Sequence, residues 1–235
     1  MRTSGSTIGA RPTHVGVIMD GNRRWAKAAG LAGASAGHRA GADHLADLLR
    51  WLTARAIRHA SVYVLSADNI RKRDGDEVAY LFHLLETLVP ARVRETGEWQ
   101  LHVAGDLDLL PTSCAVALRD AMRDTADRRS HLTLAIGYDP KQDLVDAVRD
   151  LLRDGAVHDG EALIAAIGSR LPGGPIKDID LVIRTSGERR ISGFFPWQSE
   201  HAEIVFSDKM WPAFDEGDLD AALAEYGRRR ARAAS

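Results

Sequence analysis

Short apolar runs rich in β-branched residues alternate along this chain with longer segments in which apolar residues recur every three or four positions. The short runs predict strands at 15–19, 61–65, 101–104, 132–136 and 181–183. The longer segments predict helices at 23–29, 38–56, 76–97, 111–125, 141–153, 161–171 and from 218 onward. Because strands that alternate with helices form mostly parallel sheets, we predict an α/β fold. It is a single domain whose mostly parallel central sheet of about six strands is flanked by helices.

The segments between these elements set the expected boundaries and loops. Residues 1–12 contain no apolar run and predict a flexible arm, which leaves 13–232 for the domain. The stretch 30–37, rich in Gly, Ala and Ser, predicts a mobile loop. The basic and acidic stretch that ends at Asp76 predicts a further loop.

Two predicted helices carry unusual apolar patterns. The helix at 76–97 is apolar around much of its circumference, which fits either burial between neighbours or the lining of an elongated apolar pocket. In the helix at 141–153 the apolar residues form one stripe, which we expect to be buried: Leu144, Val145, Val148, Leu151 and Leu152.

Composition excludes several classes of function. The net charge of -2 gives no overall attraction to nucleic acid or to an anionic membrane, so we expect no nucleic-acid partner and at most peripheral membrane contact. A single cysteine, Cys114, excludes a disulfide framework and favours a reduced, cytoplasmic protein. No segment has the pattern of a signal peptide or the roughly 18 apolar residues of a membrane span.

The first candidate site follows the first predicted strand. Asp20 falls at the carboxyl end of that strand, Gly21 permits a turn, and Asn22 is placed to cap the next helix. The free N–H groups of a helix start, together with Arg23 and Arg24, favour a phosphate group. A carboxylate among such donors points to a bridging Mg²⁺. The alternative is an acid that caps a helix beside two surface arginines.

The second candidate site lies after the strand at 181–183. Arg184 follows the strand directly, and Arg190 and Ser192 return after a glycine-containing loop, so the three side chains can hold one diphosphate. Three aromatic residues follow: Phe194, Phe195 and Trp197. Aromatic rings beside clustered arginines favour a ligand with a charged head and an apolar body, whereas the alternative is a surface loop with solvated arginines. Asp20, Asn69 and Arg184 would all fall at the carboxyl edge of the sheet, where such folds collect ligands.

These stretches resemble the signature motifs of the cis-prenyltransferase family, the undecaprenyl diphosphate synthase-like isoprenyl transferases. The resemblance rests on His-Val-Gly-Val-Ile-Met-Asp-Gly-Asn-Arg-Arg-Trp-Ala at 14–26, on Gly-His-Arg-Ala-Gly at 37–41 and on the stretch 184–203. It implies a homodimeric, Mg²⁺-dependent transferase that joins isopentenyl diphosphate to an allylic diphosphate (dimethylallyl, geranyl or farnesyl) with a new cis double bond. It also implies that the helices at 37–56 and 76–97 wall the product tunnel, which favours the pocket interpretation.

The resemblance assigns roles to individual residues. It makes Asp20 the metal-linked catalytic acid, and Asn69 the residue that assists proton removal. It makes Glu203 a second metal ligand, supplied near the partner's site. It assigns the allylic diphosphate to Gly21, Asn22, Arg23, Arg24, Trp25, His38, Ser66, Asp68 and Lys72. It assigns isopentenyl diphosphate to Arg184, Arg190 and Ser192.

Details within the motifs refine this picture. The stretch Leu-Ser-Ala-Asp-Asn-Ile at 65–70 and Gly193 resemble short-chain members, the Z-farnesyl diphosphate synthases, which favours a short product. At 138–143 the chain reads Tyr-Asp-Pro-Lys-Gln-Asp, whereas the family has Tyr-Gly-Gly-Arg followed by an acid. This departure motivates an alternative in which ionisation is kept but the outcome is irregular coupling, cyclisation or transfer to another acceptor. A non-catalytic subunit of a two-component enzyme is a third interpretation, and the presence of Asp20, Arg184, Arg190 and Glu203 opposes it.

Overall fold

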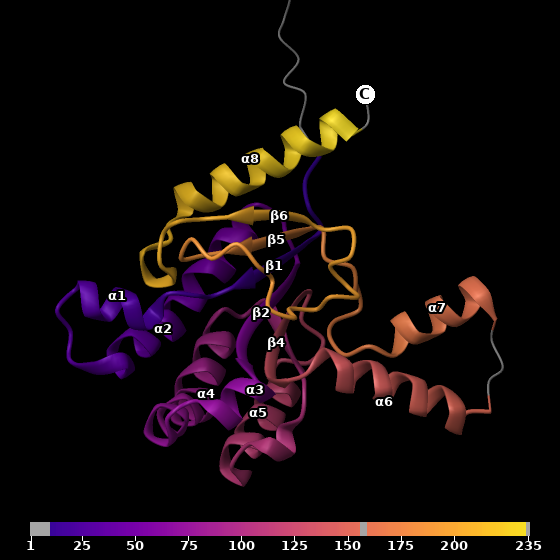
Figure 1. Cartoon of the computed structure of the whole chain (residues 1–235), viewed down its shortest axis with the longest axis horizontal. Coiled ribbons are helices and arrows are strands. Elements are labelled where there is room, and N and C mark those ends of the chain that lie inside the picture. The colour runs from indigo at the N-terminus through magenta and orange to yellow at the C-terminus, as the bar shows by residue number, and fades with distance from the viewer. Residues whose placement is uncertain (1–9, 156–158, 234–235) are drawn as a thin grey trace, which may run out of the picture.

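The computed structural model describes residues 10–155 and 159–233, and its centre is a parallel sheet (Figure 1). Within these residues six strands lie in the order β3-β4-β2-β1-β5-β6, and every neighbouring pair is parallel. They are β1 (His14–Ile18), β2 (His59–Ser66), β3 (Trp99–Ala104), β4 (Ser130–Tyr138), β5 (Leu181–Arg184) and β6 (Glu203–Phe206). The predicted fold is confirmed. Most of the predicted arm, residues 1–9, lies outside the described residues.

Eight α-helices in the described ranges connect and cover these strands. They are α1 (Asn22–Ala28), α2 (Gly33–Ala54), α3 (Ala67–Lys72), α4 (Gly75–Glu95), α5 (Thr112–Asp124), α6 (Pro140–Arg153), α7 (Gly160–Arg170) and α8 (Glu216–Ala233). Two 3₁₀ turns lie at Leu107–Leu109 and Trp211–Ala213. The predicted helices are confirmed to within a few residues. Two loop predictions are wrong, because α2 already begins at Gly33 and α3 occupies part of the stretch before Asp76. The strand β6 was not predicted.

The two faces of the sheet pack against different parts of the chain. Alternate strand residues such as Val15 join the large core formed with α2, α4, α5 and α8. The residues between them, such as Ile18, face a smaller core that Phe194 and Phe195 close from the loop between β5 and β6. A Cβ atom at Gly16 would lie 2.7 Å from the Phe194 ring, so the glycine lets this ring pack directly on β1. On this face a loop therefore covers part of the sheet, where the sequence predicts helices.

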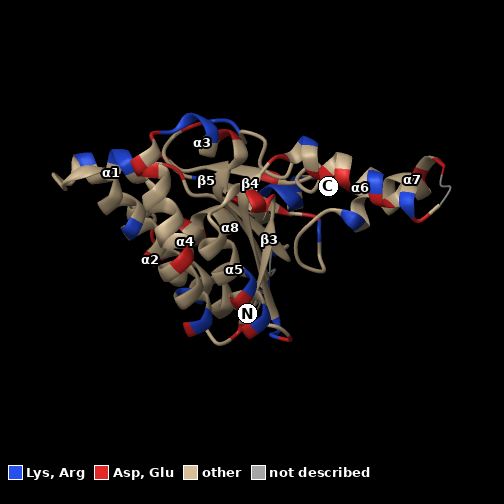
Figure 2. Cartoon of the chain, turned by 90° about the horizontal axis from the view of Figure 1, so that it is seen from below, with Lys and Arg blue, Asp and Glu red and all other residues tan. Residues whose placement is uncertain are grey.

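Helices α6 and α7 project from the body of the molecule as an arm (Figures 1 and 2). The prediction that the apolar stripe of α6 is buried is wrong for four of its five residues: Leu144, Val145, Val148 and Leu152 are 36%, 48%, 37% and 75% exposed. Leu151 is buried. The periodicity shows that the helix has one apolar face, but it does not show whether this chain supplies the partner for that face.

Among the described residues, no helix combines the length and the apolar character that crossing a membrane requires.

Candidate active site

Two hollows at the carboxyl end of the sheet meet at Asp20. The first is a cavity of about 630 Å³ between α1, α2 and α4. The second, of about 510 Å³, extends toward α3 and the start of α6. Asp20, Arg73 and Arg190 line both. The site is thus a two-part cleft with a carboxylate at its junction.

The backbone holds Asp20 from both sides. Its N–H donates to Thr185 Oγ1 at 2.9 Å, and its carbonyl oxygen accepts from the Trp211 N–H at 2.9 Å. The preceding strand β1 and the segments after β5 and β6 therefore fix where this carboxylate lies. Because three segments distant in the sequence determine the position, Asp20 is placed before any ligand binds.

Asp20 and Arg184 form the central ion pair. Arg184 Nη2 lies 2.8 Å from Asp20 Oδ2, and Arg184 Nη1 lies 2.8 Å from Ser192 Oγ. The Arg184 guanidinium also donates to the carbonyl of Arg190. Burial raises the pKa of Asp20, but the hydrogen bond and charge of Arg184 outweigh burial and hold that pKa below its ordinary value. Asp20 is therefore ionised at neutral pH.

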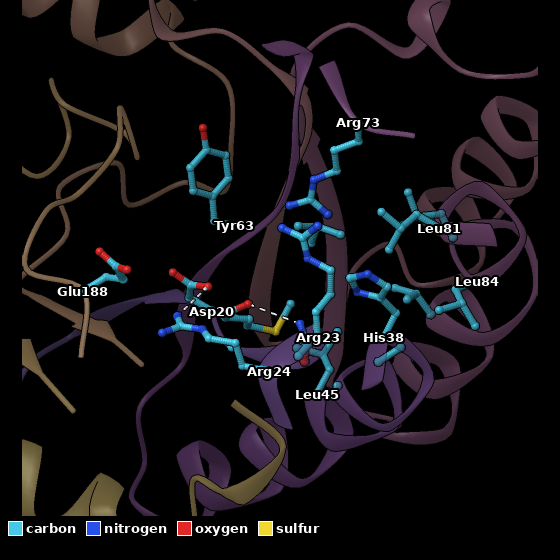
Figure 3. Close-up of a pocket in the computed structure, with 18 of the residues that line it drawn as sticks. Asp20, Arg23, Arg24, His38, Leu45, Tyr63, Arg73, Leu81, Leu84 and Glu188 are labelled. Atoms are coloured by element: carbon cyan, nitrogen blue, oxygen red, sulfur yellow. Dashed lines mark hydrogen bonds and ion pairs between the residues drawn. The ribbon is translucent and has the colours of Figure 1, made fainter. Parts of the chain in front are cut away.

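Arg24 approaches the same carboxylate from α1. Its Nη2 lies 3.6 Å from Asp20 Oδ1 (Figure 3). The same nitrogen lies 2.6 Å from Ser186 Oγ. Gly21 has φ of 104°, and a Cβ atom there would lie 2.9 Å from Met210 Cβ, so this turn requires glycine. The predicted capping role of Asn22 is wrong: Gly21 is the N-cap of α1, and Asn22 is the first helical residue. Asn22 Oδ1 is buried and has no partner among the described residues.

A second cationic cluster surrounds Glu77 at the start of α4. Glu77 Oε1 accepts from His38 Nε2 at 2.9 Å and from Arg73 Nη1 at 3.0 Å, while Arg23 Nη1 lies 3.4 Å from Oε2. Burial lowers the pKa of His38 despite the adjacent Glu77. The Arg23 and Arg73 cations, with His38 as a further hydrogen-bonding group, lie beside the apolar part of the cavity, where they can hold an anionic head group.

The structure points to Arg73, which the sequence analysis did not select, in place of the predicted Lys72. Arg73 lines both hollows, whereas Lys72 is 72% exposed, pairs with Asp68 at 2.6 Å and lines neither. The signal available in the sequence was the spacing of four between Arg73 and Glu77, and the two side chains meet across the junction between α3 and α4.

The far part of the first cavity is apolar. It is lined by leucine and valine side chains from α2 and α4: Leu45, Leu81, Leu84, Leu85 and Val89. Figure 3 shows Leu81 and Leu84 beyond His38, on the side away from Asp20. The two interpretations of the apolar helix therefore both hold, since α4 is buried against its neighbours and also walls an apolar pocket.

Residues after β2 line the second hollow. Ser66 Oγ accepts from the Asn69 N–H at 3.0 Å and caps α3, which fixes Asn69 at the edge of the hollow. Asp68 also lies here. Asp139, which departs from the family pattern, lines the same hollow and caps α6 by accepting from the Lys141 N–H at 3.0 Å.

Besides Lys72, two predicted site residues lie outside the cleft. Trp25 is half-buried in α1 and lines neither hollow. Glu203 pairs with Leu181 at the start of β5, whereas Arg184 ends that strand, so Glu203 lies toward the opposite end of the sheet from Asp20. Its carboxylate lies 3.4 Å from Arg229 of α8. In the part of the chain that the structure describes, no three carboxylate, histidine or cysteine side chains converge as a metal site.

Comparison with known proteins identifies the family. The family model described as "Putative undecaprenyl diphosphate synthase" matches residues 18–234, and the chain belongs to this prenyltransferase family. It is 42% identical over 238 residues to an isoprenyl transferase of Streptomyces fradiae, covering 97% of this chain and 92% of the relative. It is 40% identical over 232 residues to a (2Z,6E)-farnesyl diphosphate synthase of Mycolicibacterium smegmatis, covering 94% and 87%.

A solved structure supports the same assignment. Lavandulyl diphosphate synthase from Lavandula x intermedia, in complex with dimethylallyl diphosphate, superposes with a TM-score of 0.85 at 30% identity. The match covers 92% of this chain and 95% of that one.

Proposed function

We propose that this protein is a short-chain cis-prenyl diphosphate synthase that joins isopentenyl diphosphate to an allylic diphosphate. The observation that carries the proposal is the two-part cleft around Asp20: the cluster around Glu77 lies beside the leucine-lined part of the first cavity, whereas no leucine lines the second hollow. That asymmetry suits one substrate with a prenyl tail and a second, smaller substrate. The relatives named as short-chain synthases support the short product.

Each cluster would hold one substrate. Arg23, His38 and Arg73 hold the allylic diphosphate while its tail enters the leucine-lined part. Arg184, Arg190 and Ser192 hold isopentenyl diphosphate in the second hollow. The apolar walls keep water away from the allylic cation.

Asp20 fits a magnesium site completed by substrate. Mg²⁺ is commonly bound by one or two carboxylates together with substrate phosphates, and Asp20 is an ionised, partly exposed carboxylate between two phosphate-binding clusters. When bound there, Mg²⁺ neutralises charge on the departing diphosphate. Glu203 could join such a site only across a subunit interface. Asn69, in the second hollow, would assist removal of the proton from the acceptor.

We further propose a homodimer that works in the cytoplasm. The support is the exposed apolar stripe of α6, together with Ile164, which is 58% exposed on α7. Contiguous exposed apolar residues are typical of interaction surfaces.

The test is turnover by the purified chain with Mg²⁺, isopentenyl diphosphate and dimethylallyl, geranyl or farnesyl diphosphate, with products identified by mass spectrometry.

Asp20→Ala should reduce elongation by about a thousandfold, because charge stabilisation at the leaving group is lost. The matched control is Asp108→Ala, because the Asp108 side chain is 92% exposed and lines neither hollow. An active Asp20→Ala variant in a reconstituted pair would instead favour the non-catalytic subunit.

One observation favours a second candidate, the irregular coupling of two allylic units. Asp139 puts a carboxylate in the second hollow where the family has a glycine, which changes the acceptor's surroundings. A lavandulyl diphosphate synthase is also among the structures similar to this chain. Formation of a product that contains two dimethylallyl units, without consumption of isopentenyl diphosphate, would establish this candidate and reject elongation.

A further inference from the structure

Tyr63 of β2 is the one aromatic side chain, among the described residues, that lines both hollows. Figure 3 shows it near Asp20, at the end of the cavity away from Leu81 and Leu84. Tyr63 therefore lies where the reacting ends of two substrates would meet.

Buried aromatic rings hold Tyr63 in place. Its ring centroid lies 5.5 Å from that of Phe194 and 6.0 Å from that of Tyr138, and the Tyr138 ring is perpendicular to it. Both neighbours belong to the smaller core. An edge-to-face contact such as that with Tyr138 favours one ring orientation. The ring is thus fixed by the protein interior before any substrate arrives.

The hydroxyl group of Tyr63 faces the acceptor side. It donates to the carbonyl oxygen of Ser192 at 3.4 Å, and the side chain of that residue accepts from Arg184. Burial raises the pKa of Tyr63, so its hydroxyl stays protonated at neutral pH and serves as a donor, not as a base.

We propose that Tyr63 is a positioning residue that holds the acceptor's double bond against the allylic carbon and keeps water away from it. The inference rests on the proposed function. In that reaction the allylic C1–O bond breaks and diphosphate leaves with the electron pair. The terminal alkene carbon of isopentenyl diphosphate bonds to C1. C2 of isopentenyl diphosphate then loses a proton to the released diphosphate, which gives the new double bond.

The acceptor needs such a wall because Arg184, Arg190 and Ser192 can hold only its diphosphate. The Tyr63 ring supplies a rigid apolar surface for the hydrocarbon part and can stabilise positive charge developing on C1 through its π face. Without the ring, water can reach the cation and give an allylic alcohol.

The experiment compares wild type, Tyr63→Leu and Tyr63→Phe in the ratio of allylic alcohol to elongated product and in KM for each substrate. Tyr63→Leu should raise the alcohol ratio about tenfold, because alignment of the acceptor is lost. Its KM for the allylic substrate should stay within about twofold, since the cations that bind that diphosphate are untouched. Tyr63→Phe should keep the wild-type ratio of alcohol to elongated product. It should raise KM for isopentenyl diphosphate about threefold, because the neutral hydrogen bond to the Ser192 carbonyl is lost.

The matched control is Tyr80→Leu, because Tyr80 packs near His83 on α4 and lines neither hollow. A Tyr63→Leu variant with the wild-type alcohol ratio, or with a lower kcat and nothing else changed, overturns the inference. If Tyr63→Leu does not fold, an unchanged acceptor KM in Tyr63→Phe overturns it. If the proposed function is wrong, the wild-type protein does not elongate, and the inference then fails with the proposed function.

Discussion

Arg184 shows how a single residue links the two halves of the cleft. Its side chain is 5% exposed, so its charge needs partners, and it finds them in Asp20, Ser192 and the carbonyl of Arg190. The planar guanidinium reaches all of them at once, which the ammonium of lysine does not. An incoming diphosphate on the Ser192 side would therefore meet a cation that is already oriented.

Replacement of Arg73 by methionine tests the cluster around Glu77. Arg73→Met should raise KM for the allylic diphosphate at least tenfold, because one charge-assisted hydrogen bond to phosphate contributes about 1.5–3 kcal/mol. KM for isopentenyl diphosphate should change much less. Steady-state kinetics with each substrate varied in turn measures both.

The neighbouring Lys72→Met is the matched control, since that side chain is mostly exposed and pairs with Asp68. Equal effects of the two substitutions would contradict the assignment of Arg73.

The sequence alone did not separate these two basic residues, because which of them faces the cavity depends on the end of α3 at Lys72. Asp20 and Arg184, in contrast, lie at the carboxyl ends of β1 and β5 and were predictable from that position.

At the scale of elements, the contact between α1 and α2 explains a loop prediction that failed. A Cβ atom at Gly37 would lie 2.1 Å from the carbonyl oxygen of Asn22, and one at Gly41 would lie 2.3 Å from Asn22 Oδ1. The small residues at the start of α2 thus allow close packing against α1. The sequence shows only that the side chains are small, and small side chains occur both in mobile loops and in tight helix contacts.

Gly37→Ala should therefore destabilise the protein by about 1–3 kcal/mol, the usual cost of overpacking, and should weaken allylic binding by displacing α1. Gly75→Ala is the matched control, because a Cβ atom at Gly75 meets nothing within 4 Å and its backbone is not in the left-handed region. That control should be neutral or slightly stabilising. Urea unfolding of both variants measures the difference, and equal midpoints would argue against the packing account.

The arm of α6 and α7 makes a prediction about assembly. Leu152→Asp places a charge on the exposed stripe and should convert a dimer to monomers, because burying an unpaired carboxylate is costly. Val116→Asp is the matched control, since Val116 is 46% exposed on α5, which is not part of the arm. Analytical ultracentrifugation measures the mass. A monomeric wild type, or a dimer that survives Leu152→Asp, would rule out this interface.

At the scale of the whole molecule, the two ends of the sheet carry different chemistry. The carboxyl end bears the cleft, as parallel strand order leads one to expect. The amino end bears a row of histidines: His14, His59 and His131 lie opposite one another on β1, β2 and β4, and His102 Nε2 lies 3.0 Å from His131 Nδ1. The sequence predicts the strands, but only their register brings these distant histidines together.

Lowering the pH from 7.5 to 5.0 should destabilise the protein through this row. Burial, the largest cause, and the neighbouring histidines lower the pKa of His14 to about 3 and of His102 to about 4, with Lys177 acting in the same direction on His102. In the unfolded chain these groups titrate near 6.5, so below that pH the unfolded state binds more protons and stability falls until the folded pKa values are reached. The neutral His14 alone should lower the free energy of unfolding at pH 5.0 by about 2 kcal/mol.

Urea unfolding at the two pH values measures this loss of stability. The loss should shrink in His102→Gln and persist in the exposed-site control His83→Gln. Equal free energies of unfolding at pH 7.5 and 5.0 would show that the row does not stay neutral in the folded protein.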